Sequence, residues 1–128
     1  MEKITIGRAE KVNFPELDFF DIDAKVDTGA YTSSIHCHDI WENAAESILF
    51  FKLLDPSHDE YTKKVLKFDN YSKTVVKSST GIGESRYKIK TKIQIGKNSY
   101  TTSFTLTDRG SMKYPVLLGR LFLNKRFI

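Results

Sequence analysis

The chain has 128 residues, of which 40% are hydrophobic and 28% charged, so we expect one globular domain over residues 1–128 with a hydrophobic core. Its N-terminal residues lack the basic and apolar segments of a signal peptide, and its longest apolar run is too short to span a membrane. Cys37 is the only cysteine, which excludes an intrachain disulfide. A cytoplasmic protein without a membrane-spanning segment is therefore expected.

The charges are unevenly distributed along the chain, whose net charge is +4. Residues 1–60 contain 5 Lys and Arg against 13 Asp and Glu, which gives 5 − 13 = −8, whereas residues 61–128 contain 15 against 3, which gives 15 − 3 = +12. One folded domain can interleave these halves, and most of the lysines are expected on solvated surfaces. The remaining basic surface would attract an acidic partner, either a peptide or a nucleic acid.

Extended segments are predicted through the first half of the chain. The clearest is residues 20–26, where apolar and polar side chains alternate with period two, as in a strand with one buried face. The other predicted segments, in chain order, are a short strand at 4–6, a connection at 12–17 that contains Pro15, an extended segment at 31–38, a helical turn or a loop at 39–46, a buried strand at 47–54 and a turn at 55–59.

The second half of the chain contains the strongest periodic signal. Residues 86–95 place Tyr87 and three isoleucines on one face and four basic residues on the other, which predicts a long strand with a basic outer face. The neighbouring predicted elements are strands at 62–68 and 74–77, a glycine-bearing tip at 78–84, a turn at 96–98, a returning strand at 100–107, an apolar strand at 114–120 and a helical turn at 121–123. This series favours an all-β barrel or sandwich.

The strand at residues 20–26 leads directly into Asp27-Thr28-Gly29. Glycine permits a sharp turn or the close approach of another chain, because it has no Cβ atom. A carboxylate before such a turn is held rigidly and can face a cleft, which is how an aspartic protease presents its catalytic residue. The tripeptide alone fits an ordinary polar turn better, so the catalytic interpretation depends on its context.

Three elements supply that context by their order: Asp27-Thr28-Gly29-Ala30, the hairpin tip Gly81-Ile82-Gly83, and Val116-Leu117-Leu118-Gly119-Arg120. Together they resemble a single-domain retropepsin, a homodimeric aspartic protease. The chain resembles more closely the cellular retropepsin-like family labelled ATP-dependent zinc proteases, some of which accompany ATP-grasp ligases that add glutamates to a ribosomal protein. The stretches that carry this closer resemblance are Ile6-Gly7-Arg8, residues 24–30, Thr32-Ser33, Ser85-Arg86-Tyr87, Leu106-Thr107, Arg109, Met112 and residues 115–120.

The resemblance implies a closed retropepsin-like β-barrel with at most one or two short helices, and an active site shared by two copies of the chain. Asp27, Thr28 and Gly29 would be the catalytic residues. The two Asp27 carboxylates would share one proton, so that the ionised one activates a water and the protonated one polarises the scissile carbonyl. Thr28 would form a hydrogen bond across the dimer. The substrate-binding residues would be Ala30, Tyr31, Gly81, Ile82, Gly83, Arg86 and Arg120, with the hairpin closing over the substrate.

The function that the resemblance implies is an aspartic peptidase acting on a peptide or isopeptide bond, with a poly-glutamate tail as substrate. The basic face of residues 86–92 suits such an acidic tail, although likeness of fold does not establish a substrate. The sequence departs from the pattern at Tyr31, where the cellular family has a basic residue and viral retropepsins have an Asp that pairs with the arginine of Gly-Arg. Arg120 therefore needs another partner.

No metal or other cofactor is expected, despite the family label, and the chain is not expected to be a zinc protease. It contains no His-Glu-x-x-His motif. His36 and His38 would share one face of a strand, with Cys37 pointing away. Because two ligands make a poor zinc site, we interpret both as surface histidines.

Two other classes of function remain open. A non-catalytic retropepsin-like module would bind acidic peptides and keep Asp27 for structural reasons. A nucleic-acid-binding β-barrel would use the basic strand at residues 86–92, with Tyr87 as a stacking platform. The sequence favours this second alternative least, because Tyr87 shares a face with Ile89 and Ile93 and is expected to point into the core.

Overall fold

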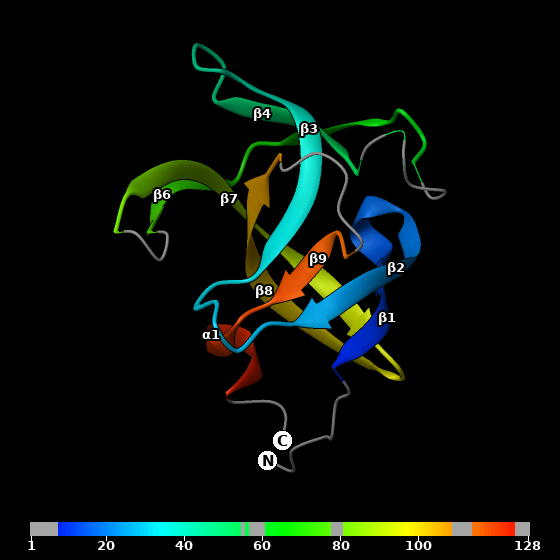
Figure 1. Cartoon of the computed structure of the whole chain (residues 1–128). Coiled ribbons are helices and arrows are strands. Elements are labelled where there is room, and N and C mark those ends of the chain that lie inside the picture. The colour runs from blue at the N-terminus through cyan, green and yellow to red at the C-terminus, as the bar shows by residue number, and fades with distance from the viewer. Residues whose placement is uncertain (1–7, 55, 57–60, 78–80, 109–113, 125–128) are drawn as a thin grey trace.

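The computed structural model describes residues 8–54, 56, 61–77, 81–108 and 114–124, and these ranges consist mainly of strands (Figure 1). The elements, in chain order, are β1 (Ala9–Phe14), the 3₁₀ helix η1 (Pro15–Leu17), β2 (Phe19–Val26), β3 (Ser34–Asn43), β4 (Ile48–Leu53), β5 (Val65–Phe68), β6 (Tyr71–Lys77), β7 (Gly83–Ile95), β8 (Asn98–Thr107), β9 (Val116–Leu118) and the helix α1 (Arg120–Leu123). Within these ranges no helix combines the length and the apolar character needed to cross a membrane.

Six of the strands close into a barrel in the order β3-β8-β7-β1-β2-β9. The short strand β9 completes it, because it pairs parallel with β2 and antiparallel with β3. Strands β4 and β5 extend the sheet beyond β3, and β6 pairs with the outer part of β7. The predicted all-β closed barrel with short helices is therefore confirmed.

Alternation along β7 builds one wall of the core, as predicted. Its even-spaced apolar positions Ile89, Ile93 and Ile95 are buried, whereas Lys90 and Lys92 between them are exposed. This pattern follows from the pleat, which directs successive side chains to opposite faces of a sheet. The predictions of β2, β4, the β7–β8 hairpin and the helical turn after residue 120 are also confirmed, with ends shifted by a few residues.

The β6–β7 hairpin projects from the barrel (Figure 1). β8 pairs with β7 only from Lys88 onward, whereas β6 pairs with β7 from Gly83 to Ile89. Residues 83–87 therefore belong to the hairpin alone. The hairpin tip contains Gly81, whose φ of +83° is a conformation that residues with a side chain rarely adopt.

Two local predictions are wrong. Residues 12–17 were expected to form a connection, but β1 continues to Phe14 and only the proline-containing segment after it is a short helix. Residues 39–46 were expected to form a helical turn or a loop, but β3 continues to Asn43. Its register with β4 shifts between His38 and Trp41, and Asp39 has a φ of 50°, so a β-bulge interrupts the alternation that would have revealed the strand.

Three other predictions lie outside the described residues, wholly or in large part. They are the strand at residues 4–6, most of the turn at 55–59, and residues 78–80 of the glycine-bearing tip.

Candidate active site

Asp27 lies immediately after β2, where the barrel is closed by β9. Its backbone N–H donates to the carbonyl of Leu118 at 3.0 Å, so the pairing between β2 and β9 continues into the residue that carries the carboxylate. All three residues of β9 are buried. The backbone of Asp27 is therefore fixed against the barrel core, while its side chain remains partly exposed.

The turn after Asp27 holds the carboxylate in one orientation. The backbone N–H of Gly29 donates to Asp27 Oδ1 at 3.0 Å, and the N–H of Ala30 donates to the Asp27 carbonyl at 3.2 Å. Such local bonds from a carboxylate to the backbone two residues on are the reason that Asp favours turns. Both bonds leave the second carboxylate oxygen available to a ligand.

The segment that begins α1 crosses beside this loop and is bonded to it. Arg120 N–H donates to the carbonyl of Ala30 at 2.8 Å, and Leu121 N–H donates to that of Tyr31 at 2.9 Å. A Cβ atom on Gly119 would lie 2.5 Å from the carbonyl carbon of Thr32. The two backbones therefore approach more closely than a side chain at position 119 would permit.

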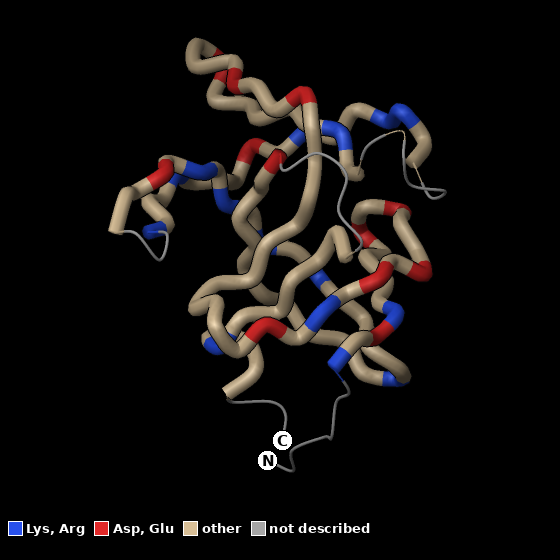
Figure 2. The backbone as a smooth tube through the Cα atoms, viewed as in Figure 1, with Lys and Arg blue, Asp and Glu red and all other residues tan. Residues whose placement is uncertain are grey.

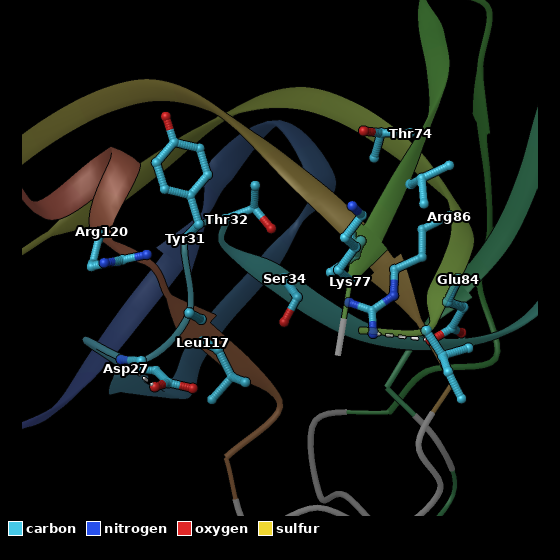
Figure 3. A pocket seen from close by; sticks show the side chains of 15 residues that line it. Asp27, Tyr31, Thr32, Ser34, Thr74, Lys77, Glu84, Arg86, Leu117 and Arg120 are labelled. Atoms are coloured by element: carbon cyan, nitrogen blue, oxygen red, sulfur yellow. Dashed lines mark hydrogen bonds and ion pairs between the residues drawn. The ribbon is translucent and has the colours of Figure 1, made fainter. Parts of the chain in front are cut away.

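A cleft of about 730 Å³ separates the Asp27 loop from the β6–β7 hairpin (Figure 3). Seven of the residues predicted for the site line it: Asp27, Gly29, Ala30, Tyr31, Ile82, Arg86 and Arg120. Three predicted residues are not part of the lining: Thr28, which is exposed beside Asp27, and Gly81 and Gly83 at the hairpin tip.

The sequence did not indicate several other residues that line the cleft: Thr32, Ser34, Thr74, Val76, Lys77, Glu84 and Leu117. A signal for two of them exists in the pairing of β6 with β7. Thr74 lies opposite Arg86, and Val76 opposite Glu84, so these four side chains share one face of the hairpin, and Val75 and Lys77 of its other face also line the cleft. Knowledge of the hairpin register would have placed them there.

Three basic side chains, Lys77, Arg86 and Arg120, and two acidic ones, Asp27 and Glu84, line the cleft. Arg86 has a side chain that is 12% exposed, and its Nη2 donates to Glu84 at 3.1 Å. Its Nε atom is buried and has no hydrogen-bond partner among the described residues. Lys77 and Arg120 add two further positive charges to the lining. Figure 2 shows that acidic and basic positions are interleaved along the backbone of the described residues.

Arg120 has the alternative partner that the sequence required. Its guanidinium carbon lies 5.7 Å from the centre of the Tyr31 ring, a distance suited to a cation–π contact. Tyr31 is 59% exposed, so this pair forms an open edge of the cleft beside Asp27 (Figure 3).

The two histidines are differently placed from the prediction. His36 is buried, with 1% exposure, so its interpretation as a surface histidine is wrong; it lies on β3 where that strand crosses the core. His38 is partly buried, with Nδ1 2.6 Å from the carbonyl of Leu54 and Nε2 3.1 Å from the hydroxyl of Tyr61. Among the described residues, no group of three His, Cys, Asp or Glu side chains is arranged to hold a metal ion.

The sequence and the fold both match known proteins. A family model described as "Retropepsin-like aspartic endopeptidase RimB" matches residues 5–127. The chain belongs to this RimB-like family. It is 40% identical over 124 residues to a protein of Shewanella pealeana and 34% identical over 128 residues to a protein of Desulfotalea psychrophila, both named "Probable alpha-L-glutamate ligase".

These two alignments cover 92% and 98% of this chain but only 26% and 28% of the relatives, so the chain spans about a quarter of the length of the curated proteins it matches. The structure is similar to that of Lpg0085 from Legionella pneumophila, described as a protein with unknown function (DUF785), with a TM-score of 0.70 and 25% identity. That match covers 98% of this chain and 89% of the other. The RimB-like barrel is thus shared over nearly the whole chain.

Proposed function

We propose that this RimB-like chain is one half of a homodimeric aspartic peptidase, with Asp27 as its catalytic residue. The observation that carries the proposal is the placement of the Asp27 carboxylate, which a backbone fixed to the barrel presents to a cleft beneath a projecting hairpin. Membership of a family described as aspartic endopeptidases supports the same chemistry.

The proposed mechanism needs a second copy of the chain. Within the described lining of the cleft, the carboxylate other than Asp27 belongs to Glu84, which is paired with Arg86. A second Asp27 must therefore come from a partner copy across a two-fold axis. Two carboxylates held that close share one proton, because like charges oppose full ionisation of both.

The chemical step then uses one carboxylate as a base and the other as an acid. The ionised Asp27 removes a proton from a water, whose oxygen forms a bond to the scissile carbonyl carbon, while the protonated Asp27 gives its proton to the carbonyl oxygen. Collapse of the tetrahedral intermediate breaks the C–N bond, and the proton taken from water passes to the leaving nitrogen. As the carbonyl re-forms, a hydroxyl proton of the intermediate returns to the other Asp27, so the pair regains its starting protonation state.

The proposed substrate is an acidic peptide, with a poly-glutamate tail joined by peptide or isopeptide bonds as the leading candidate. Lys77, Arg86 and Arg120 line the cleft and favour negatively charged side chains. The names of the Shewanella and Desulfotalea relatives, which contain a region similar to this chain, connect the family with glutamate ligation. A peptidase that removes ligated glutamates is consistent with that connection.

Replacement of Asp27 tests this proposal. We expect Asp27→Asn to lower kcat on a glutamate-rich peptide by at least about 10³-fold, because an amide cannot act as the base. Asp23→Asn is the matched control: it also removes a carboxylate from β2, but one that pairs with Lys11 at 2.8 Å and is not part of the cleft lining. Undiminished turnover by Asp27→Asn would refute the catalytic role.

The same assay separates the peptidase from a non-catalytic module. The cationic cleft would bind an acidic peptide in either case. Tight binding by the wild type with no cleavage at any pH would favour the module. The nucleic-acid alternative has less support, since the Tyr87 ring packs against the core and its hydroxyl bonds to Glu42 at 3.3 Å instead of being free to stack on a base.

A further inference from the structure

Glu42, near the outer end of β3, contacts three side chains of the β6–β7 hairpin. The Tyr71 hydroxyl donates to Glu42 Oε2 at 2.5 Å, the Tyr87 hydroxyl donates to Oε1 at 3.3 Å, and Lys73 Nζ lies 3.1 Å from Oε1. Tyr71 and Lys73 belong to β6 and Tyr87 to β7, so one carboxylate joins both strands of the hairpin to β3. We call these four residues the Glu42 cluster.

The hairpin side chains in the cluster also contact one another. The rings of Tyr71 and Tyr87 meet edge to face, with centroids 6.1 Å apart, and the Lys73 ammonium lies 5.4 Å from the centre of the Tyr87 ring. Glu42 has a side chain that is only 20% exposed. The carboxylate is therefore partly buried, whereas the Lys73 side chain is 58% exposed, so the tyrosine hydrogen bonds are expected to contribute more to the cluster than the ion pair.

Protonation states in the cluster suit this role at neutral pH. The hydrogen bond from Tyr71, together with Lys73 and Tyr87, lowers the pKa of the Glu42 carboxyl. Glu42 in turn raises the pKa of Tyr71 to about 12. The carboxylate is thus charged while the Tyr71 phenol keeps its proton, which is the condition for a strong, charge-assisted hydrogen bond between them.

The hairpin residues of the Glu42 cluster lie on the face of the hairpin opposite to Thr74 and Arg86, which line the cleft. Lys73 pairs with Tyr87 across the two strands, and the next pair along is Thr74 with Arg86. Since successive residues of a strand point to opposite faces, the first pair faces Glu42 and the second faces the cleft. Figure 3 shows Thr74 and Arg86 on the hairpin wall of the cleft, across from Asp27.

The position of the cluster along β7 explains why such an anchor matters. Pairing with β8 begins at Lys88, one residue after Tyr87, so the strand leaves the barrel at the cluster. Beyond that point β7 has β6 as its paired strand. A small change of angle at this base would displace the cleft-lining side chains farther out on the hairpin.

We infer that Glu42 is a positioning residue: its carboxylate anchors the base of the β6–β7 hairpin to β3 and thereby fixes Thr74 and Arg86 opposite Asp27. The structural part of this inference stands without any catalysis, whereas its effect on turnover rests on the proposed peptidase function.

Hydrogen exchange on the free protein tests the structural part. We expect Glu42→Gln to accelerate amide exchange in β6 and in residues 83–87 by about three- to tenfold, because it removes the charge that the two tyrosines and Lys73 contact. Exchange in β1 and β2 should remain unchanged. Asp39→Asn is the matched control: it removes a carboxylate from the same strand, but one that pairs with Lys52 of β4 at 3.1 Å. Asn also tolerates the positive φ at that position.

Either of two results would overturn the inference: unchanged exchange in β6, or an equal acceleration in the hairpin and in the barrel strands. In the first case Glu42 does not anchor the hairpin, and in the second it acts on stability as a whole. Because exchange needs no substrate, this outcome is independent of whether the chain proves to be a peptidase.

Kinetics on a cleaved peptide test the consequence for the site. With Asp27 intact, Glu42→Gln should raise KM about three- to tenfold, as substrate meets a less ordered hairpin wall, and change kcat less. Tyr71→Phe should reproduce part of the increase, since it removes one hydrogen bond and keeps the ring. If Asp27→Asn abolishes activity but Glu42→Gln leaves KM unchanged, the positioning role of Glu42 is contradicted while the proposed peptidase function stands.

Discussion

The two walls of the cleft are built in opposite ways. The Asp27 loop is bonded to β9 and to the start of α1 by successive backbone hydrogen bonds, and the β9 strand beneath it is buried. The β6–β7 hairpin stands outside the barrel and exposes apolar side chains at Val75 and Ile82, by 64% and 72%. The Asp27 loop is held in place by the barrel core, whereas the position of the β6–β7 hairpin depends on the contacts at its base.

This difference suits the proposed roles of the two walls, in which the loop carries the catalytic carboxylate and the hairpin covers the substrate. A catalytic carboxylate must be held in a defined place, because small misplacements greatly reduce rate. A wall that admits and covers a peptide must move, and exposed, projecting segments have the low local stability that movement requires. The comparison predicts that a substitution that forces the loop and the α1 segment apart acts on the fold, whereas substitutions on the hairpin act on substrate binding.

The largest effect on the fold is expected at Gly119. Gly119→Ala should lower the free energy of unfolding by about 1–3 kcal/mol, because the new Cβ would meet the backbone of Thr32, at 2.5 Å from its carbonyl carbon. Urea denaturation of the purified variant measures this loss. The matched control is Gly29→Ala, whose Cβ would have Asp27 Oδ1 as its nearest neighbour at 3.3 Å, a tight contact that a small shift of the side chain can relieve. Equal stabilities of the two variants would contradict the close approach of the Gly119 and Thr32 backbones that fixes this wall.

A smaller effect, on binding alone, is expected at Arg86. Its Nε atom is buried without a partner among the described residues, and its Nη2 contacts Glu84. Arg86→Gln should raise KM for a glutamate-rich peptide about tenfold, because a charge-assisted hydrogen bond to a substrate carboxylate is lost. Stability should change little. Competition between matched acidic and neutral peptides measures the loss of preference.

Lys90→Gln is the control for that measurement. Lys90 lies four residues farther along β7 on the same face of the strand, is exposed, and is not part of the cleft lining. It changes the net charge by the same amount without touching the site. If both variants weakened acidic-peptide binding equally, the general positive charge of the protein, not Arg86, would account for the preference.

Much of the barrel was predictable because local patterns determine it. Alternation marks β7, and the series of apolar and polar residues before Asp27 marks β2. The prediction failed where a bulge at Asp39 interrupts β3 and where the short β1 continues to Phe14, just before Pro15. In both places pairing with the next strand along the chain supplies the strand, and no uninterrupted local period reveals it.

The candidate site could likewise be predicted only where its signal lies within a short stretch of sequence. The motif around Asp27 and the Gly119-Arg120 segment could be predicted, since each carries its signal within a few residues. Glu42 could not, because its three partners are 29 to 45 positions away in the sequence and meet it only in the folded barrel. The hairpin register, which places Thr74 beside Arg86, likewise depends on pairing between strands.

Mixing subunits tests most directly whether two copies of the chain share one active site. Wild-type protein at a fixed concentration would be titrated with Asp27→Asn and assayed on a glutamate-rich peptide, with sedimentation to follow dimer formation. If mixed dimers form and are inactive, activity should fall to about half at an equimolar amount of the variant and further with excess. Activity that stays constant while mixed dimers form would contradict a shared Asp27 dyad.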